Sequence, residues 1–195
     1  MQEQSLEREL EQRLIREAAA GNRDSAGELV RAHQNSLFLY LVRMTGNHSQ
    51  AEDLVQEAFV RALVHLDRFD PRFRFSTWVF TIARRLYLNA AAKRRPAYGS
   101  DYVGESADTG VRGRSAESET SDTLQSALLE LPEVQREIVI LFHQQEWKVS
   151  LIAAYLGLPE GTVKSHLHRG RRKMREFMQR ASGSSRGGAR SGVGA

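Results

Sequence analysis

The stretch TVKSHLHRGRRK, residues 162–173, combines two histidines with five Lys or Arg residues. Neighbouring histidines could bind a metal ion, whereas the positive charge could bind nucleic acid. Each helical residue turns the chain by about 100°, so His166 and His168 would diverge by about 200° and cannot share a metal ion. Histidines that bind zinc on a helix lie at positions i and i+4 instead. No metal and no other cofactor is therefore expected, and nucleic acid is the expected ligand.

The helix that carries this stretch has an apolar side and a polar side. The side expected to face a core consists of Val163, Leu167, Gly170, Met174 and Phe177. The opposite side carries Ser165, His168, Arg169 and Arg172, flanked by Lys164, Arg171 and Arg175. Ser, His and Arg side chains can reach base edges and phosphates together, so the polar side suits a DNA major groove. His166 lies near the apolar edge and is expected to pack.

The elements before this helix are those of a helix-turn-helix. A helix is expected from Pro132 to about Gln144, and a short helix from Ser150 to Leu156. Gly157 can adopt the left-handed backbone that ends a helix, and the turn through Leu158 and Pro159 leads to the basic helix. A short helix, a glycine-containing turn and a longer basic helix are typical of DNA-binding domains.

A second basic segment, residues 71–95, reads PRFRFSTWVFTIARRLYLNAAAKRR and combines aromatic residues with seven Lys or Arg residues and no acidic ones. Aromatic rings stack on unpaired bases and cations bind phosphates, so the segment suits single-stranded nucleic acid. A loop at residues 69–75 and a helix from Ser76 or Thr77 to about Lys93 are expected. The alternative for Phe80 and Tyr87 is ordinary packing, and Trp78 could equally anchor a core.

The helix before this loop, expected from Ser49 to about Leu66, has a complete apolar stripe that must be core. Ser49 and Glu52 have the spacing of a capping box. The opposite side carries Asp53, Gln56, Glu57, Val60 and Val64. Acidic residues mixed with valines favour a docking surface for another protein. The alternative, equally open at this point, is that the valines contact a neighbouring helix of the same domain.

The hydrophobic spacing is helical almost throughout and predicts an all-α protein with two small helical domains. We expect an N-terminal domain at 1–96, a flexible acidic, Gly/Ser-rich linker at 97–122, a C-terminal helix-turn-helix domain at 123–180 and a disordered tail at 181–195. The absence of cysteine excludes disulfides, and no apolar run is long enough to span a membrane. A cytoplasmic location is therefore expected.

No catalytic set of residues is present, so an enzyme is not expected. A small nuclease would need clustered carboxylates, but Glu52, Asp53 and Glu57 diverge on their helix. A helix-turn-helix regulator that acts alone remains an alternative, although it would have no use for a basic aromatic segment beside an acidic partner face.

Four segments together resemble a known family: AEDLVQEAFVRAL, FRFSTWVFTIARR, LPEVQREIVILF and GLPEGTVKSHLHRGRRKM. They are similar to the extracytoplasmic-function (ECF) group of bacterial RNA polymerase sigma factors. The resemblance covers roughly residues 10 to 178 in two blocks. It implies a subunit that binds core RNA polymerase, recognises −35 and −10 promoter elements, and helps to open the DNA. An anti-sigma factor is a possible further partner.

The resemblance also implies roles for individual residues. Docking to the clamp coiled coil of the largest polymerase subunit falls on Asp53, Gln56, Glu57, Val60 and Val64. Recognition and melting of the −10 element, with capture of an unpaired base, falls on Phe73, Phe75, Ser76, Trp78, Arg84, Arg85, Asn89 and Arg94. Reading of the duplex −35 element falls on Thr162, Lys164, Ser165, His168, Arg169, Arg171 and Arg172.

Overall fold

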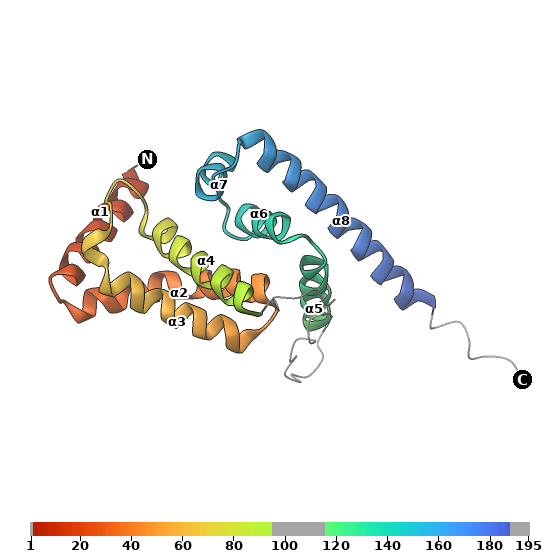
Figure 1. The fold of residues 1–195 in the computed structure, drawn as a ribbon, viewed down its shortest axis with the longest axis horizontal. Coiled ribbons are helices and arrows are strands. Elements are labelled where there is room, and N and C mark those ends of the chain that lie inside the picture. The colour runs from red at the N-terminus through yellow and green to blue at the C-terminus, as the bar shows by residue number, and fades with distance from the viewer. Residues whose placement is uncertain (1, 95–115, 188–195) are drawn as a thin grey trace, which may run out of the picture. The chain divides into compact units, whose positions relative to one another are not determined.

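The computed structural model describes residues 2–94 and 116–187, with side chains for residues 7–93 and 120–181 (Figure 1). All regular elements in these ranges are helices, which confirms the all-α prediction. The chain divides into two compact units, residues 1–106 and 107–195, which are described separately below.

The first unit contains α1 (Gln2–Ala19), α2 (Arg23–Thr45), α3 (His48–Val64), the 3-10 helix η1 (Leu66–Arg68) and α4 (Phe75–Arg94). Asparagine side chains set the starts of two helices. The Asn22 Oδ1 accepts hydrogen bonds from the backbone N–H groups of Asp24 and Ser25, and the Asn47 Oδ1 accepts one from Gln50. The capping box predicted at Ser49 is therefore wrong, because Asn47 caps α3 at an earlier residue.

The core of this unit is built where α2 packs against α3 and α4. Tyr40 and Phe80 are almost fully buried, and their ring centroids lie 5.1 Å apart. Tyr87 is also buried, at 7% exposure. For Phe80 and Tyr87 the packing alternative is thus the correct one. Their burial fixes which side of α4 remains outside.

The second unit contains α5 (Ala116–Leu129), α6 (Glu133–His143), α7 (Val149–Leu156) and α8 (Glu160–Gly187). Helix α5 begins inside the segment predicted as linker, and α8 continues into the segment predicted as a disordered tail. Those predictions are wrong for residues 116–122 and 181–187. Extending an existing helix costs little because each added residue gains a hydrogen bond. The rest of the expected linker and tail, residues 97–115 and 188–195, lies outside the described residues.

Two glycines determine how α8 is positioned, one through its backbone conformation and one through close packing. Gly157 ends α7 with a φ of 68°, the left-handed conformation expected there. Gly170 is buried where α8 crosses α6, and a Cβ atom added to it would lie 2.8 Å from the Val139 Cγ2. This close approach needs a glycine. With Val163 and Leu167 also buried, the apolar side of α8 faces the core and the opposite side is left to solvent.

Candidate nucleic-acid interface

The exposed side of α8 brings most of the predicted DNA-contacting residues together. Lys164, Ser165, His168 and Arg169 line one shallow depression on the surface. Thr162 is half-buried in the first turn of α8, and Arg172 is exposed one turn beyond His168. His166 is half-buried, as expected for a residue at the apolar edge. The two histidines therefore face different surroundings.

The cations on this side have only weak partners within α8. The Lys164 Nζ lies 3.9 Å from the Glu160 carboxylate, and the Arg172 Nε lies 3.7 Å from that of Glu176. All four side chains are more than half exposed. Exposed pairs of this kind contribute about 0–1 kcal/mol, so a phosphate can replace the carboxylate at little cost.

Arg171 also has partners on a neighbouring helix. Its Nε donates a hydrogen bond of 2.9 Å to the His143 Nε2, and its guanidinium carbon lies 5.0 Å from the centre of the Phe142 ring. These contacts hold Arg171 against α6. Burial, and next the Arg171 charge, lowers the pKa of His143, so a neutral imidazole accepts this bond. Arg171 thus joins α8 to α6 while its side chain stays exposed, and its contact with DNA stays a prediction.

In the loop between η1 and α4, the two phenylalanines predicted to contact the −10 element differ in burial. Phe75 is fully buried, with ring centroids 6.1 Å from Phe69, 5.9 Å from Trp78 and 5.4 Å from His33. A ring in this position cannot stack on a base, so Phe75 is a core anchor of the loop. Phe73, in contrast, is 60% exposed. The loop therefore presents an unpartnered ring above a buried aromatic cluster.

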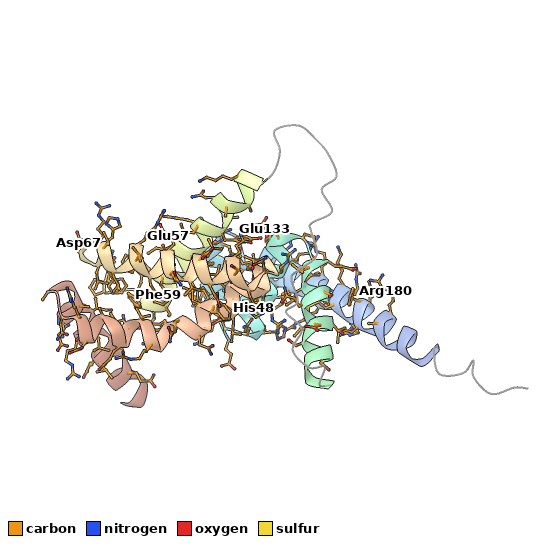
Figure 2. The ribbon with its side chains drawn as sticks, turned by 90° about the horizontal axis from the view of Figure 1, so that it is seen from below. His48, Glu57, Phe59, Asp67, Glu133 and Arg180 are labelled. Atoms are coloured by element: carbon orange, nitrogen blue, oxygen red, sulfur yellow. The ribbon has the colours of Figure 1, made fainter. Side chains whose placement is uncertain are left out.

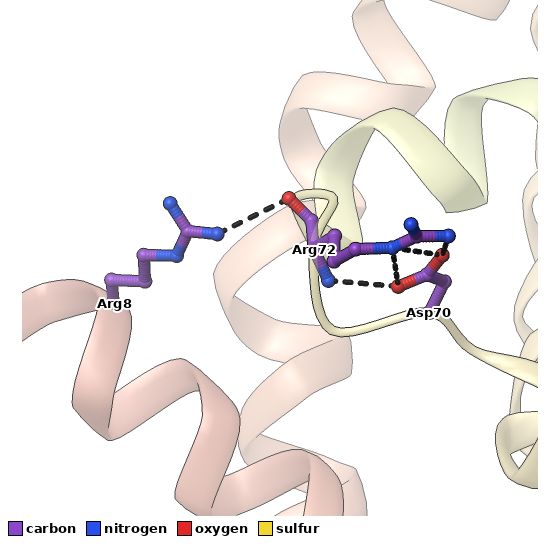
Figure 3. A network of polar contacts seen from close by, with 3 residues as sticks. All are labelled: Arg8, Asp70 and Arg72. Carbon is purple, nitrogen blue, oxygen red and sulfur yellow. Dashed lines mark hydrogen bonds and ion pairs between the residues drawn. The ribbon is translucent and has the colours of Figure 1, made fainter.

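A tight turn shapes the loop. The Arg72 guanidinium donates from Nε to both oxygens of the Asp70 carboxylate, at 3.0 and 2.9 Å, and from Nη2 to one of them at 2.6 Å (Figure 3). The Phe73 N–H donates to the Asp70 carbonyl at 3.0 Å. Hydrogen bonds from the Arg72 side chain and then from its backbone N–H hold the pKa of Asp70 below its usual value. The charged carboxylate accepts these bonds across the turn.

Helix α4 carries the remaining predicted −10 residues. Arg85 and Asn89 are exposed, whereas Ser76, Trp78 and Arg84 are half-buried. The ring centroid of Trp78 lies 5.3 Å from that of Phe69, so Trp78 contributes to the core, and its side chain remains partly exposed. Arg94 ends α4, but its side chain lies outside the described residues.

The outer side of α3 is a separate surface, which we call the α3 face: Asp53, Gln56, Glu57, Val60 and Val64. Val60 is 57% exposed and Val64 67% exposed, so neither packs against a neighbouring helix of the described unit. Glu57 pairs with Arg61 through an N–O distance of 2.6 Å. Figure 2 shows Glu57 and Phe59 on opposite sides of α3. Phe59 is only 5% exposed, which marks its side as the core side.

Sequence reasoning missed the contacts that α1 makes with the loop. The Arg8 Nη2 donates to the Arg72 carbonyl at 3.1 Å, and the Gln12 Nε2 donates to the Pro71 carbonyl at 3.4 Å. Side chains at positions 8, 11, 12 and 15 share one face of a helix, and that spacing was a signal that α1 has a partner. The spacing does not reveal that this partner is the loop at residues 71–72, because the two segments are far apart in the sequence.

Two further observations concern other kinds of site. Among the described residues, no group of three or more His, Cys, Asp or Glu side chains could hold a metal ion. No helix in the described ranges is both long enough and apolar enough to cross a membrane.

Comparison with known families identifies both units. Residues 29–96 match the model of sigma-70 region 2, and residues 121–174 match that of sigma-70 region 4. The ECF RNA polymerase sigma factor SigW of Bacillus subtilis is 32% identical over 181 residues, covering 85% of this chain and 95% of SigW. The ECF sigma factor SigL of Mycobacterium tuberculosis is 33% identical over 83% of this chain and 93% of SigL.

Solved structures agree in fold. CnrH, in complex with the cytosolic domain of CnrY, superposes with a TM-score of 0.68 at 25% identity, covering 87% of this chain and 97% of CnrH. The sigma factor RpoE of Bartonella quintana, in complex with the anti-sigma factor NepR, gives a TM-score of 0.62 at 24% identity over 78% of this chain and 96% of RpoE.

Both sigma-70 regions occur here in the expected order, and relatives match over nearly their whole length. The chain therefore belongs to the ECF family of RNA polymerase sigma factors, which direct core polymerase to promoters and help it to initiate transcription.

Proposed function

We propose that three surfaces of this sigma factor divide the work of initiation. The α3 face docks on the clamp coiled coil of the largest polymerase subunit. The loop at residues 69–74 and α4 open the −10 element, and α8 reads the −35 element as duplex DNA. The observation that carries the proposal is the exposure of Val60 and Val64 beside carboxylates, since a regulator that acts alone needs no such partner surface.

The chemistry of the α3 face defines its partner. Two exposed valines offer apolar area at the C-terminal end of α3, and Asp53, Gln56 and Glu57 offer acceptors in the preceding turns. A helical partner with apolar residues flanked by Arg or Lys would bury the valines and pair the acids. Because the Glu57–Arg61 pair is about half exposed, a partner arginine can displace Arg61 at small cost.

The loop and α4 suit unpaired DNA. Phe73 is the exposed ring of the loop and offers a stacking surface for a base that has left the duplex. Arg85 and Asn89 continue along the exposed side of α4, where they can bind the phosphate backbone and base edges of a single strand. Trp78 and Arg84 border this surface, with Ser76 at its start. The buried ring of Phe75 packs against Trp78 and so supports this surface from the core.

Helix α8 suits the major groove. The depression at Lys164, Ser165, His168 and Arg169 offers donors and acceptors within one turn, and the exposed Arg172 follows it. In this arrangement Ser165, His168 and Arg169 reach base edges, while Lys164 and Arg172 bind phosphates, with Thr162 at the helix start.

We also propose that the chain acts in the cytoplasm as an initiation factor rather than as a catalyst, and that an anti-sigma protein restrains it. CnrH, whose structure is similar, is bound to the cytosolic domain of CnrY. A segment that covers the α3 face would exclude the polymerase, which is a simple means of restraint.

The division of work is tested with two variants of similar exposure. Val60→Asp should weaken binding to core polymerase at least roughly tenfold, because a charge replaces a central apolar contact. Phe73→Asp should leave core binding unchanged and abolish promoter opening, measured by permanganate reactivity of unpaired thymines. The proposal fails if Val60→Asp binds core polymerase as tightly as the wild type, or if the two variants have the same phenotype.

A further inference from the structure

We propose that α1 is a positioning element for the DNA-opening loop: Arg8, Glu11 and Gln12 hold residues 70–74 in the shape that presents Phe73. Helix α1 precedes the residues that match sigma-70 region 2, so that match assigns it no role. The inference rests on the proposed function of the loop.

The contacts come from one face of α1. Ile15 is 7% exposed and anchors this face against the unit. One turn earlier, Glu11 and Gln12 lie beside the loop, and Arg8 extends the row by another turn. Figure 3 shows the Arg8 guanidinium reaching across from α1 to the carbonyl of Arg72. Arg8 and Gln12 donate hydrogen bonds to backbone carbonyls, so they restrain the backbone of the loop directly and not through its side chains.

Glu11 is the most enclosed member of the row, with only 14% of its side chain exposed. Its carboxylate lies 3.6 Å from the His33 Nε2 and 3.9 Å from the Arg74 Nη1. Glu11 thereby links α1 to α2 and to the end of the loop. A shielded carboxylate is less screened than an exposed one, so this link adds to the two hydrogen bonds that Arg8 and Gln12 make.

The loop needs such support because its own restraints are few. Phe69 and Phe75 anchor its two ends in the aromatic cluster, and the Asp70–Arg72 fork closes the turn. The hydrogen bonds from α1 to Pro71 and Arg72 add two restraints from outside the loop. A loop ordered before binding pays less conformational entropy when it captures a base, so opening is favoured.

The test uses the full-length protein with core polymerase and a duplex promoter. The variant combines Arg8→Ala, Glu11→Gln and Gln12→Ala. Arg13→Ala is the matched control, because Arg13 pairs with Glu17 within α1 at 3.8 Å and leaves the loop contacts intact. Core affinity, the thermal unfolding midpoint and permanganate reactivity at the −10 element are measured, both in the wild-type background and with Phe73→Ala.

The triple variant should bind core polymerase normally and form roughly tenfold fewer open complexes, because two hydrogen bonds and two ion pairs of modest strength are lost together. In the Phe73→Ala background it should have no further effect, since α1 acts through Phe73. Arg13→Ala should behave like the wild type.

Normal opening by the triple variant would overturn the role of α1 while leaving the loop's function intact, provided Phe73→Ala is defective. An equal further loss in the Phe73→Ala background would show a general structural effect and also overturn it. If Phe73→Ala itself opens promoters normally, the proposed function of the loop fails, and the inference with it.

Discussion

Gly170→Ala tests how the second unit positions α8. The added Cβ would lie 2.8 Å from the Val139 Cγ2, closer than such contacts allow. Val139 is β-branched and 4% exposed, so its side chain cannot turn away. Either α8 moves outward from α6 or the core distorts, and both displace the side chains on the outer side of α8.

The magnitude follows from two opposing effects. Overpacking a core costs about 1–3 kcal/mol, whereas replacing a helical glycine with alanine gains about 1 kcal/mol. We therefore expect Gly170→Ala to lower the free energy of unfolding by about 1 kcal/mol. Gly161→Ala is the matched control, because it lies on the same helix and its added Cβ meets no atom within 4 Å. That control should be neutral or stabilising.

The assay is urea unfolding of the full chain followed by tryptophan fluorescence. The chain has two tryptophans, so a Trp78→Phe background leaves Trp147 to report on the second unit. Trp147 packs against Tyr155 with a centroid distance of 5.1 Å and should respond when the unit unfolds. If Gly170→Ala is as stable as Gly161→Ala, the close crossing of α6 and α8 is refuted.

Three further predictions concern the second unit. Arg172→Ala should weaken binding of the holoenzyme to all promoters and reduce the salt dependence by about one phosphate contact; an unchanged salt slope would remove Arg172 from the phosphate contacts. His168→Ala should change the preferred −35 sequence in a selection from random DNA, and an unaltered preference would exclude it as a base reader. Because burial and the Arg171 charge lower the pKa of His143 in the folded state, the unfolded chain binds more protons below about pH 6.5. Stability should be full above that pH and fall as the pH drops toward the folded pKa; His143→Gln should lose less stability than the wild type between pH 7 and pH 5.5 in urea unfolding.

Helical periodicity predicted much of this structure because it reports which side of a helix is buried. It separated Phe59 from Val60 on α3, and their exposures in the structure agree. It also placed Gly170 on the apolar side of α8, where the structure buries it. Which side of a helix is buried depends on residues within a few turns of one another, so this property can be predicted from the spacing of apolar residues.

The errors share a different physical origin. Phe73 and Phe75 each follow an arginine in the sequence, but the fold of the loop buries Phe75 and leaves Phe73 exposed. Arg171 lies at the edge of the polar side, and its hydrogen bond to His143 of α6 was not predicted. The contacts of Arg8 and Gln12 join residues about sixty positions apart. Loop direction and long-range polar pairs depend on tertiary packing, which periodicity does not encode.

The central claim is that this chain directs core RNA polymerase to a defined start site. The most direct test is run-off transcription from a promoter library with core polymerase, with and without the protein, followed by sequencing of the transcript ends. We predict transcripts from a small set of start sites sharing −35 and −10 elements, only when the protein is present and not with Val60→Asp. Transcription no different from that of core polymerase alone would contradict the account.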